Sequence, residues 1–154
     1  MSTDPSRDAA CDDVFQQLFA INRMARVVGA EIYRRMGIQR TQVALLGSVA
    51  RRGEVRLSDL ACEQQVDPSV VSRQLQGLEQ EGLVTRRPDP DDRRATLVRL
   101  TDDGTATLAR AVGMYRDAVA SWLSDWSTPE IEHTAAALRR MASSQAVAGA
   151  EVSA

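Results

Sequence analysis

The sequence predicts a mainly α-helical protein with one small β-sheet in its middle. Apolar side chains recur at helical spacing over residues 9–36 and again over residues 102–126, which indicates a long amphipathic helix near each end of the chain. Residues 84–98 instead contain two short runs of strand-forming residues on either side of a turn rich in Asp and Pro. The expected fold class is therefore mainly α, with the small β-element projecting from the central part.

Composition indicates a globular protein that remains in the cytoplasm. The chain has 154 residues, of which 44% are hydrophobic and 26% charged, and no apolar run approaches the roughly 20 residues that span a bilayer. Several aspartates occupy the N-terminal segment, where a secretion signal needs basic and apolar residues. In a cytoplasmic protein, Cys11 and Cys62 are expected to form no structural disulfide, and Cys62 is expected to be a small buried side chain.

No pattern in the sequence points to catalysis, to a cofactor or to a metal ion. A nucleophile elbow, a phosphate-binding loop, a dinucleotide-binding glycine pattern and a His-Glu-x-x-His motif are all missing. His133 is the single histidine, and the cysteines form no Cys-x-x-Cys motif. We therefore expect a protein that is not an enzyme and needs no cofactor.

The charge of the chain is placed unevenly. The net charge is −2, which does not by itself indicate a nucleic-acid binder. Residues 37–100 hold ten arginines and nine acidic residues, net +1, whereas residues 101–154 hold four arginines and seven acidic residues, net −3. The acidic excess thus lies outside the central part. An anionic partner would be repelled least at the central part, residues 37–100.

Residues 67–82 predict a capped helix with two distinct faces. Asp67 suits an N-cap, Pro68 suits the first helical position, and Gly82 suits a left-handed C-terminal cap. The apolar face consists of Val71, Leu75 and Leu78. The polar face consists of Ser69, Ser72, Arg73 and Gln76. A helix seated on a core with such a face outward is what reading the DNA major groove requires; an ordinary amphipathic surface helix is the alternative.

The β-hairpin that follows carries a group of arginines, Arg86, Arg87, Arg93 and Arg94, which we expect to crowd its tip. Guanidinium groups suit phosphate oxygens and the narrow minor groove. Asp89 and Pro90 suit the first two positions of a type I turn, and we interpret Asp92 as a brace for a neighbouring arginine. The alternative is a solvated charged turn without a partner.

Two shorter helices precede the capped helix, and a small third strand is expected at residues 55–57. We expect Thr41 to cap the first of these helices and Ser58 the second. The second is joined to the capped helix by the short connection at residues 66–67, which is typical of a helix-turn-helix unit.

The long terminal helices favour a homodimer. A helix over residues 9–36 would be about 42 Å long, more than a compact domain of this size can cover, and helices from both ends of the chain can interlock with a second copy. The alternative is a monomer with a helical layer over the central part. A two-fold dimer would match a palindromic DNA site.

Three ordered motifs connect these elements. They are Leu78-Glu79-x-x-Gly82-Leu83-Val84, Arg86-Arg87-x-Asp89-Pro90-x-Asp92-Arg93-Arg94 and Leu100-Thr101-x-x-Gly104. In this order and spacing the chain resembles the MarR family of winged helix-turn-helix transcriptional regulators. The resemblance implies a recognition helix at residues 68–81 and places the family's Asp-x-Arg wing motif on Asp92 and Arg94. Val70 departs from it by standing where a hydroxyl residue is usual.

The resemblance implies a domain plan and a function. A winged helix-turn-helix at residues 38–100 would be flanked by dimerisation helices at residues 1–37 and 101–154. The expected function is transcription regulation by a homodimeric repressor that binds a palindromic double-stranded DNA operator. The expected DNA-binding residues are Ser69, Val70, Ser72, Arg73, Gln76, Arg86, Arg87, Asp92, Arg93 and Arg94.

The resemblance also implies a trigger. Family members commonly respond to small aromatic or phenolic effectors, for which the apolar candidates are Phe19, Met24 and Tyr33; each also suits a core position. A redox trigger at Cys11 is a second option, although alignment with the peroxide-sensing branch puts Leu18 at the sensing position. A different class of function also remains: a winged-helix dimer that binds proteins or sequesters a ligand, which the net acidic charge motivates.

Overall fold

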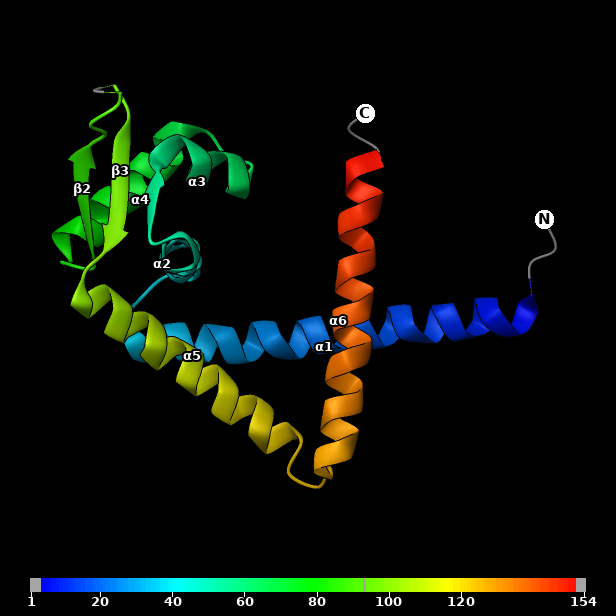
Figure 1. The fold of residues 1–154 in the computed structure, drawn as a ribbon. Helices are drawn as coiled ribbons and strands as arrows, with labels where there is room; N and C mark the ends of the chain where they lie inside the picture. Colours follow the sequence, from blue (N-terminus) through cyan, green and yellow to red (C-terminus); the bar gives the residue numbers. More distant parts are fainter. Residues whose placement is uncertain (1–3, 93, 152–154) are drawn as a thin grey trace. The chain divides into compact units, whose positions relative to one another are not determined.

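The structure, a computed structural model, describes residues 4–92 and 94–151. In agreement with the sequence, the described part is mainly helical with one small antiparallel sheet (Figure 1). Its elements are α1 (Pro5–Met36), α2 (Arg40–Arg52), β1 (Glu54–Arg56), α3 (Leu57–Gln64), α4 (Pro68–Gln80), β2 (Val84–Pro88), β3 (Thr96–Leu100), α5 (Asp102–Trp122) and α6 (Thr128–Glu151). The chain divides into two compact units, Met1–Arg116 and Asp117–Ala154.

The core of the first unit is built where α2, α3 and α4 meet the sheet. Its fully buried side chains come from all of these elements and include Leu45, Leu46, Val49, Leu60, Val71, Leu75, Leu78, Val84 and Val98. At roughly 1.5–3 kcal/mol for each large aliphatic side chain removed from water, this cluster stabilises the helix-turn-helix of α3 and α4 together with the hairpin of β2 and β3.

The sheet has the strand order β1-β3-β2, so β3 is central and the other two strands are edges. Val98 of β3 lies opposite Val55 on one side and Arg86 on the other. Leu97, which points to the opposite face, lies between Arg56 and Arg87 in the same way. The hairpin of β2 and β3, with the turn that joins them, is the wing.

The two long helices expected from sequence differ from their expected bounds at two ends. α1 begins at Pro5 instead of near residue 9, because the Asp4 carboxylate accepts a 3.0 Å hydrogen bond from the backbone N–H of Ser6. α5 ends at Trp122 instead of near residue 126. α6, after α5, extends to Glu151. The expected stop of α1 at Gly37 is confirmed by its left-handed φ of 65°.

Two of the expected caps are wrong. α2 is capped by Gln39, one residue before its first helical residue, and the Gln42 side chain accepts a 2.7 Å hydrogen bond from the Gln39 N–H. Thr41 is therefore inside the helix. Ser58 is also inside its helix, because α3 starts at Leu57, directly after β1. None of the helices in residues 4–92 and 94–151 has the length and apolarity that crossing a bilayer requires.

Candidate nucleic-acid interface

Helix α4 is fixed in place by its caps and its apolar face. The Asp67 carboxylate accepts a 2.8 Å hydrogen bond from the Ser69 N–H, and Pro68 begins the helix. Gly82, just past the end, has a φ of 72°, which only glycine adopts without strain. The apolar residues Val71, Leu75 and Leu78 are all 0% exposed, so the predicted core face of this helix is confirmed.

The opposite face of α4 carries the predicted polar residues. Ser69, Arg73 and Gln76 are exposed, whereas Ser72 and Val70 are half-buried. The Arg73 Nε lies 3.4 Å from the backbone carbonyl oxygen of Ser69, at the long limit of a hydrogen bond, and Arg73 is in no ion pair with another described residue. The face thus offers neutral hydrogen-bonding groups and one guanidinium that no carboxylate holds.

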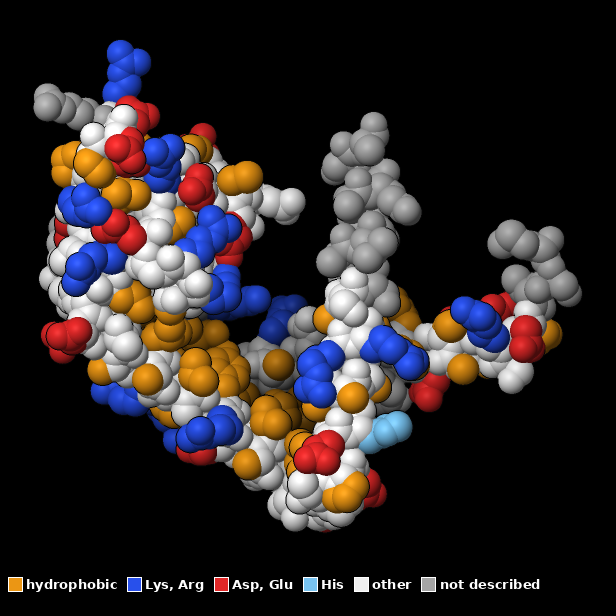
Figure 2. Space-filling model, in the orientation of Figure 1, with side chains coloured by type: hydrophobic (Ala, Val, Ile, Leu, Met, Phe, Trp, Pro, Cys, Tyr) orange, Lys and Arg blue, Asp and Glu red, His pale blue; other side chains and the backbone are white. Residues whose placement is uncertain are grey.

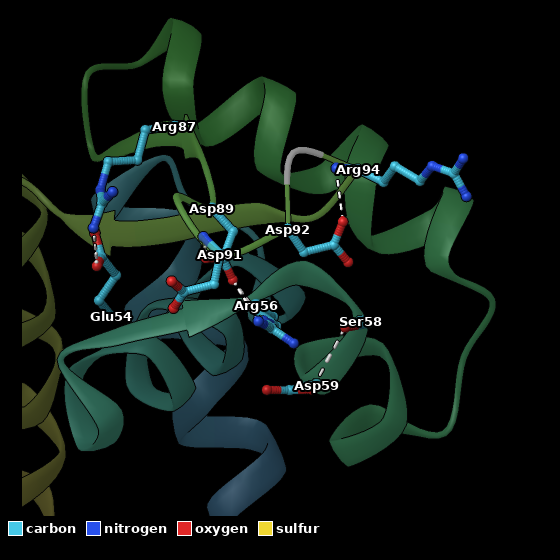
Figure 3. A network of polar contacts seen from close by, with 9 residues as sticks. All are labelled: Glu54, Arg56, Ser58, Asp59, Arg87, Asp89, Asp91, Asp92 and Arg94. Carbon is cyan, nitrogen blue, oxygen red and sulfur yellow. Dashed lines mark hydrogen bonds and ion pairs between the residues drawn. The ribbon is translucent and has the colours of Figure 1, made fainter.

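The wing turn is closed by backbone hydrogen bonds. The Asp89 N–H donates to the Ala95 carbonyl oxygen at 3.0 Å, and the Ala95 N–H donates to that of Asp92 at 2.8 Å. The Asp92 carboxylate accepts a 3.0 Å hydrogen bond from the Arg94 backbone N–H. The Arg94 side chain extends away from the other labelled groups (Figure 3), and no other described residue forms an ion pair with it.

Among the described arginines, an aspartate of this wing holds only Arg56, and that aspartate is Asp89. Asp92 instead fixes the backbone at Arg94, since its short side chain reaches the N–H two residues on. The Asp89 side chain is only 5% exposed and pairs with Arg56 at 2.7 Å. A hydrogen bond from the Asp91 backbone, together with the Arg56 guanidinium, holds the pKa of Asp89 below its usual value.

The expectation that four arginines crowd the tip is wrong for two of them. Arg86 pairs with Glu79 of α4, and Arg87 pairs with Glu54 of β1 through its Nε and Nη2, at 2.9 and 2.6 Å. Both arginines lie along β2 and are neutralised inside the chain: the antiparallel register of the sheet brings Glu54 of β1 within reach of Arg87, and the helix that precedes β2 supplies Glu79 to Arg86. Arg93 lies outside the described residues.

Charge of both signs covers the wing and the helix-turn-helix. Figure 2 shows blue and red side chains interspersed over this part of the face drawn, without a broad basic area. The partners of the β2 arginines and of Asp89 were missed from the sequence. Period-two alternation places Glu54 and Arg56 on one face of β1, which could have indicated a charged sheet face.

The effector candidates do not come together. Phe19 is 65% exposed and its ring lies 4.7 Å from that of Phe15, and Met24 is 46% exposed. Phe19 lines a depression of about 1160 Å³, and Tyr33 lines a different one, of about 400 Å³, on the first unit. Its other lining residues are Asn22, Ala25, Arg26, Gly29, Ala30, Arg40 and Tyr115.

The two cysteines are both free and exposed. For Cys62 this corrects the expectation of a buried side chain: α3 turns Leu60 and Ala61 toward the core and leaves the next position outward. For Cys11, exposure on α1 leaves the thiol accessible, and its role as a redox trigger stays a prediction.

Comparison with known proteins places the chain among regulators. A sequence model of the MarR family matches residues 38–96. The multiple antibiotic resistance protein MarR of Salmonella typhimurium is 30% identical over 101 residues, which cover 61% of this chain and 70% of that protein. The chain belongs to the MarR family. The HTH-type transcriptional regulator YdgJ of Bacillus subtilis is 35% identical over 94 residues, which cover 61% of this chain and 57% of that protein.

The fold agrees with that of solved MarR structures. A mutant MarR from E. coli, complexed with operator DNA, superposes with a TM-score of 0.65 and 21% identity, covering 90% of this chain and 99% of that one. The expected fold class, a winged helix-turn-helix between long terminal helices, is therefore confirmed.

Proposed function

We propose that this MarR-family chain is a homodimeric transcriptional regulator, most simply a repressor, that binds palindromic double-stranded DNA. The observation that carries the proposal is that one compact unit combines an outward polar face on a capped helix with a wing arginine, Arg94, that forms no ion pair with another described residue. Operator DNA bound to a MarR of the same fold supports it. Residues 38–100 would contact DNA, and residues 1–37 and 101–154 would form the dimer.

The side chains of α4 match the groups that the major groove displays. Arg73 can bind guanine through two donors, Gln76 can bind adenine, and Ser69 and Ser72 can bind either. Val70 can contact a thymine methyl group. Arg94 would enter the minor groove or hold phosphate. Arg86 and Arg87, although predicted from sequence to touch DNA, would first have to leave their carboxylate partners.

Exposed apolar side chains support the dimer. On α1 they are Val14, Phe15, Leu18, Phe19, Ile21, Met24 and Val27, between 36 and 67% exposed. In the second unit, Val119, Trp126, Leu138 and Met141 are exposed by 39 to 46%. Apolar patches of this kind on a soluble protein mark interaction sites, and a second copy that brings the same helices would cover them on both molecules.

The depression beside Tyr33 supports an effector site. Two tyrosine rings, Tyr33 and Tyr115, form its aromatic wall, while Arg26 and Arg40 supply positive charge. A small aromatic or phenolic effector, in particular one with a carboxylate, suits that lining. Its binding would shift the protein toward a state that releases DNA.

The test is selection of bound DNA by the full chain. Purified protein is mixed with fragmented genomic DNA from its source, and the retained fragments are sequenced. We expect an inverted repeat with its half-sites about one helical turn apart, and a dimer in size-exclusion chromatography with light scattering. Failure to retain any fragment at low salt, or a strictly monomeric protein, would contradict the proposal.

A second candidate function has one observation in its favour. Arg56, Arg86 and Arg87 are all paired with carboxylates, which leaves the wing and the helix-turn-helix nearly neutral for a DNA-binding surface. A winged-helix dimer that binds a protein or sequesters a ligand would need no more charge than this. Such a dimer would retard no duplex at low salt and would still bind its protein or aromatic ligand.

A further inference from the structure

Two ion pairs cross the central strand of the sheet. Glu54 of β1 reaches Arg87 of β2, and Arg56 of β1 reaches Asp89, which directly follows β2 (Figure 3). Since β1 and β2 are each bonded to β3 and not to one another, these side chains join the two edges over Leu97. The pairs have opposite polarity, with the acid on β1 in one and the base on β1 in the other.

The two pairs differ in what else they hold. The Glu54–Arg87 pair is exposed, with 32% and 51% of the side chains accessible. Asp89 is buried, and both of its oxygens are used. Oδ2 accepts a 2.7 Å hydrogen bond from the Nε of Arg56 and lies 2.7 Å from its Nη2, and Oδ1 accepts from the Asp91 N–H at 2.9 Å. A buried carboxylate that lost Arg56 would remain charged without a counterion, which is strongly unfavourable.

Arg56 also stands at the start of the helix-turn-helix. It is the last residue of β1 and the N-cap residue of α3, whose first helical residue is Leu57. α3 packs against α4 through the common core. On its other side, Asp89 is hydrogen-bonded to Asp91 and Ala95 in the turn that presents Arg94. One ion pair therefore joins the helical unit to the wing turn.

We propose that Arg56 and Asp89 are positioning residues, which hold the wing turn at a fixed place relative to α4. The inference rests on the proposed function, because it concerns how α4 and Arg94 engage one duplex at the same time. With the pair intact, the binding geometry of both elements exists before DNA arrives, so less ordering free energy is lost on association. Neither residue needs to touch DNA for this role.

Removing a charge distinguishes positioning from simple attraction. Asp89→Asn makes the protein more positive near DNA, so attraction alone predicts tighter binding. Positioning predicts weaker binding, because the amide loses the ion pair with Arg56. Glu54→Gln is the matched control: it removes the same charge from the parallel ion pair on the same sheet face and leaves the wing turn intact.

The experiment measures binding of the full-length variants to a duplex recovered by the genomic selection, using fluorescence anisotropy. We expect Asp89→Asn to weaken binding about tenfold, and Glu54→Gln to bind within about twofold of the wild type or more tightly. In the Arg94→Ala background, Asp89→Asn should add less than about twofold, since the arginine that it positions is gone. If Asp89 acted only on general folding, the double variant would lose affinity by the product of the losses in Asp89→Asn and Arg94→Ala.

Hydrogen exchange of the wing turn, followed by mass spectrometry without DNA, gives a second measurement. Faster exchange in Asp89→Asn and in Arg56→Gln, with Glu54→Gln unchanged, is expected. Binding of Asp89→Asn as tight as that of the wild type, or fully multiplicative losses with Arg94→Ala, would overturn the inference and leave the proposed function standing. If the wild type binds no duplex, the proposed function fails. Hydrogen exchange of the wing turn that is unchanged in Asp89→Asn and Arg56→Gln would then also show that the ion pair does not hold the turn.

Discussion

The hydroxyl group of Tyr115 donates a 2.7 Å hydrogen bond to that of Tyr33, and so joins α5 to α1. The two rings meet edge to face, with centroids 6.2 Å apart. A Cβ added at Gly29 would lie 2.3 Å from the Tyr115 hydroxyl, so only glycine leaves room for this contact. Burial, followed by the hydrogen bond to Tyr33, raises the pKa of Tyr115 to about 12.

This contact predicts a pH dependence of stability at the alkaline limit. The pKa of Tyr115 in the folded chain lies above its unfolded value of roughly 10, so its contribution is fully present below that pH and is lost as the pH rises toward 12. Tyr115→Phe should flatten the alkaline loss of unfolding free energy, measured by urea denaturation at several pH values. If the unfolding free energy of the wild type and of Tyr115→Phe fell equally steeply at alkaline pH, the raised pKa of Tyr115 would not be the cause.

Gly104, in the first turn of α5, is expected to tolerate no side chain. An added Cβ would lie 1.9 Å from the carbonyl oxygen of Leu83, a backbone atom that cannot move away alone. Thr101 fixes the same junction, donating from its hydroxyl to the Gly82 carbonyl oxygen at 2.6 Å and accepting from the Gly104 N–H at 2.9 Å. Gly104→Ala should lower the free energy of unfolding by about 1–3 kcal/mol, measured by chemical denaturation.

Gly113 provides the control in the same helix. A Cβ there meets nothing within 4 Å, and alanine is the better helix former by about 1 kcal/mol. Gly113→Ala should therefore be neutral or stabilising. A destabilisation equal to that of Gly104→Ala would show that α5 tolerates alanine poorly in general, against the steric explanation.

The cap of α4 predicts an acid-side effect. Hydrogen bonds from Ser69 hold the pKa of Asp67 below its ordinary value, so the stabilisation is present above that value and is lost as the pH falls through the folded pKa. Asp67→Ala should lower the unfolding temperature by about 3 °C at neutral pH. Asp67→Asn keeps an N-cap acceptor without a charge, and should stay close to the wild type at neutral pH while losing the dependence on acid.

The elements of this fold could be predicted because their signals are local. Asp67, Pro68 and Gly82 mark the two ends of α4 within the chain itself, and the buried stripe of that helix follows from spacing alone. The caps that failed were also local choices. α2 begins at Arg40, one residue before the expected cap Thr41, and the Gln42 side chain instead accepts a hydrogen bond from the Gln39 N–H.

Which arginines are held in ion pairs could not be predicted from sequence, because the pairs of Arg87 and Arg56 depend on how the strands are aligned. Arg87 faces Glu54 across β3, 33 residues away in sequence, and Arg56 faces Asp89 at the same separation. For these two pairs, the register of the sheet decides which carboxylate reaches which guanidinium. The sequence thus placed arginines on the hairpin correctly without separating the paired ones from Arg94.

Arg73 is predicted to select one base. It stands on the exposed face of α4 without an ion-pair partner among the described residues. Arg73→Ala should cost about 1–3 kcal/mol in binding and relax selectivity at a single position of each half-site. The measurement is anisotropy against duplexes that carry every base at every position. Arg73→Lys, which keeps the charge and loses the planar pair of donors, should restore affinity without selectivity. An equal loss for all duplexes would indicate a phosphate contact instead.

Arg94 and Arg87 are predicted to differ although both belong to the wing. Arg94 is free of carboxylates among the described residues, so it can replace the cations that surround phosphate. Arg94→Ala should weaken binding to all sequences and reduce the slope of log affinity against log salt by about 1 for each subunit. Arg87→Ala should change the slope less, because the Arg87 guanidinium is already held by both oxygens of Glu54. Titrations over a range of salt concentrations compare the two variants directly. An unchanged slope in Arg94→Ala would remove the wing from the binding surface, and a larger effect of Arg87→Ala would mean that DNA competes successfully with Glu54 for this arginine.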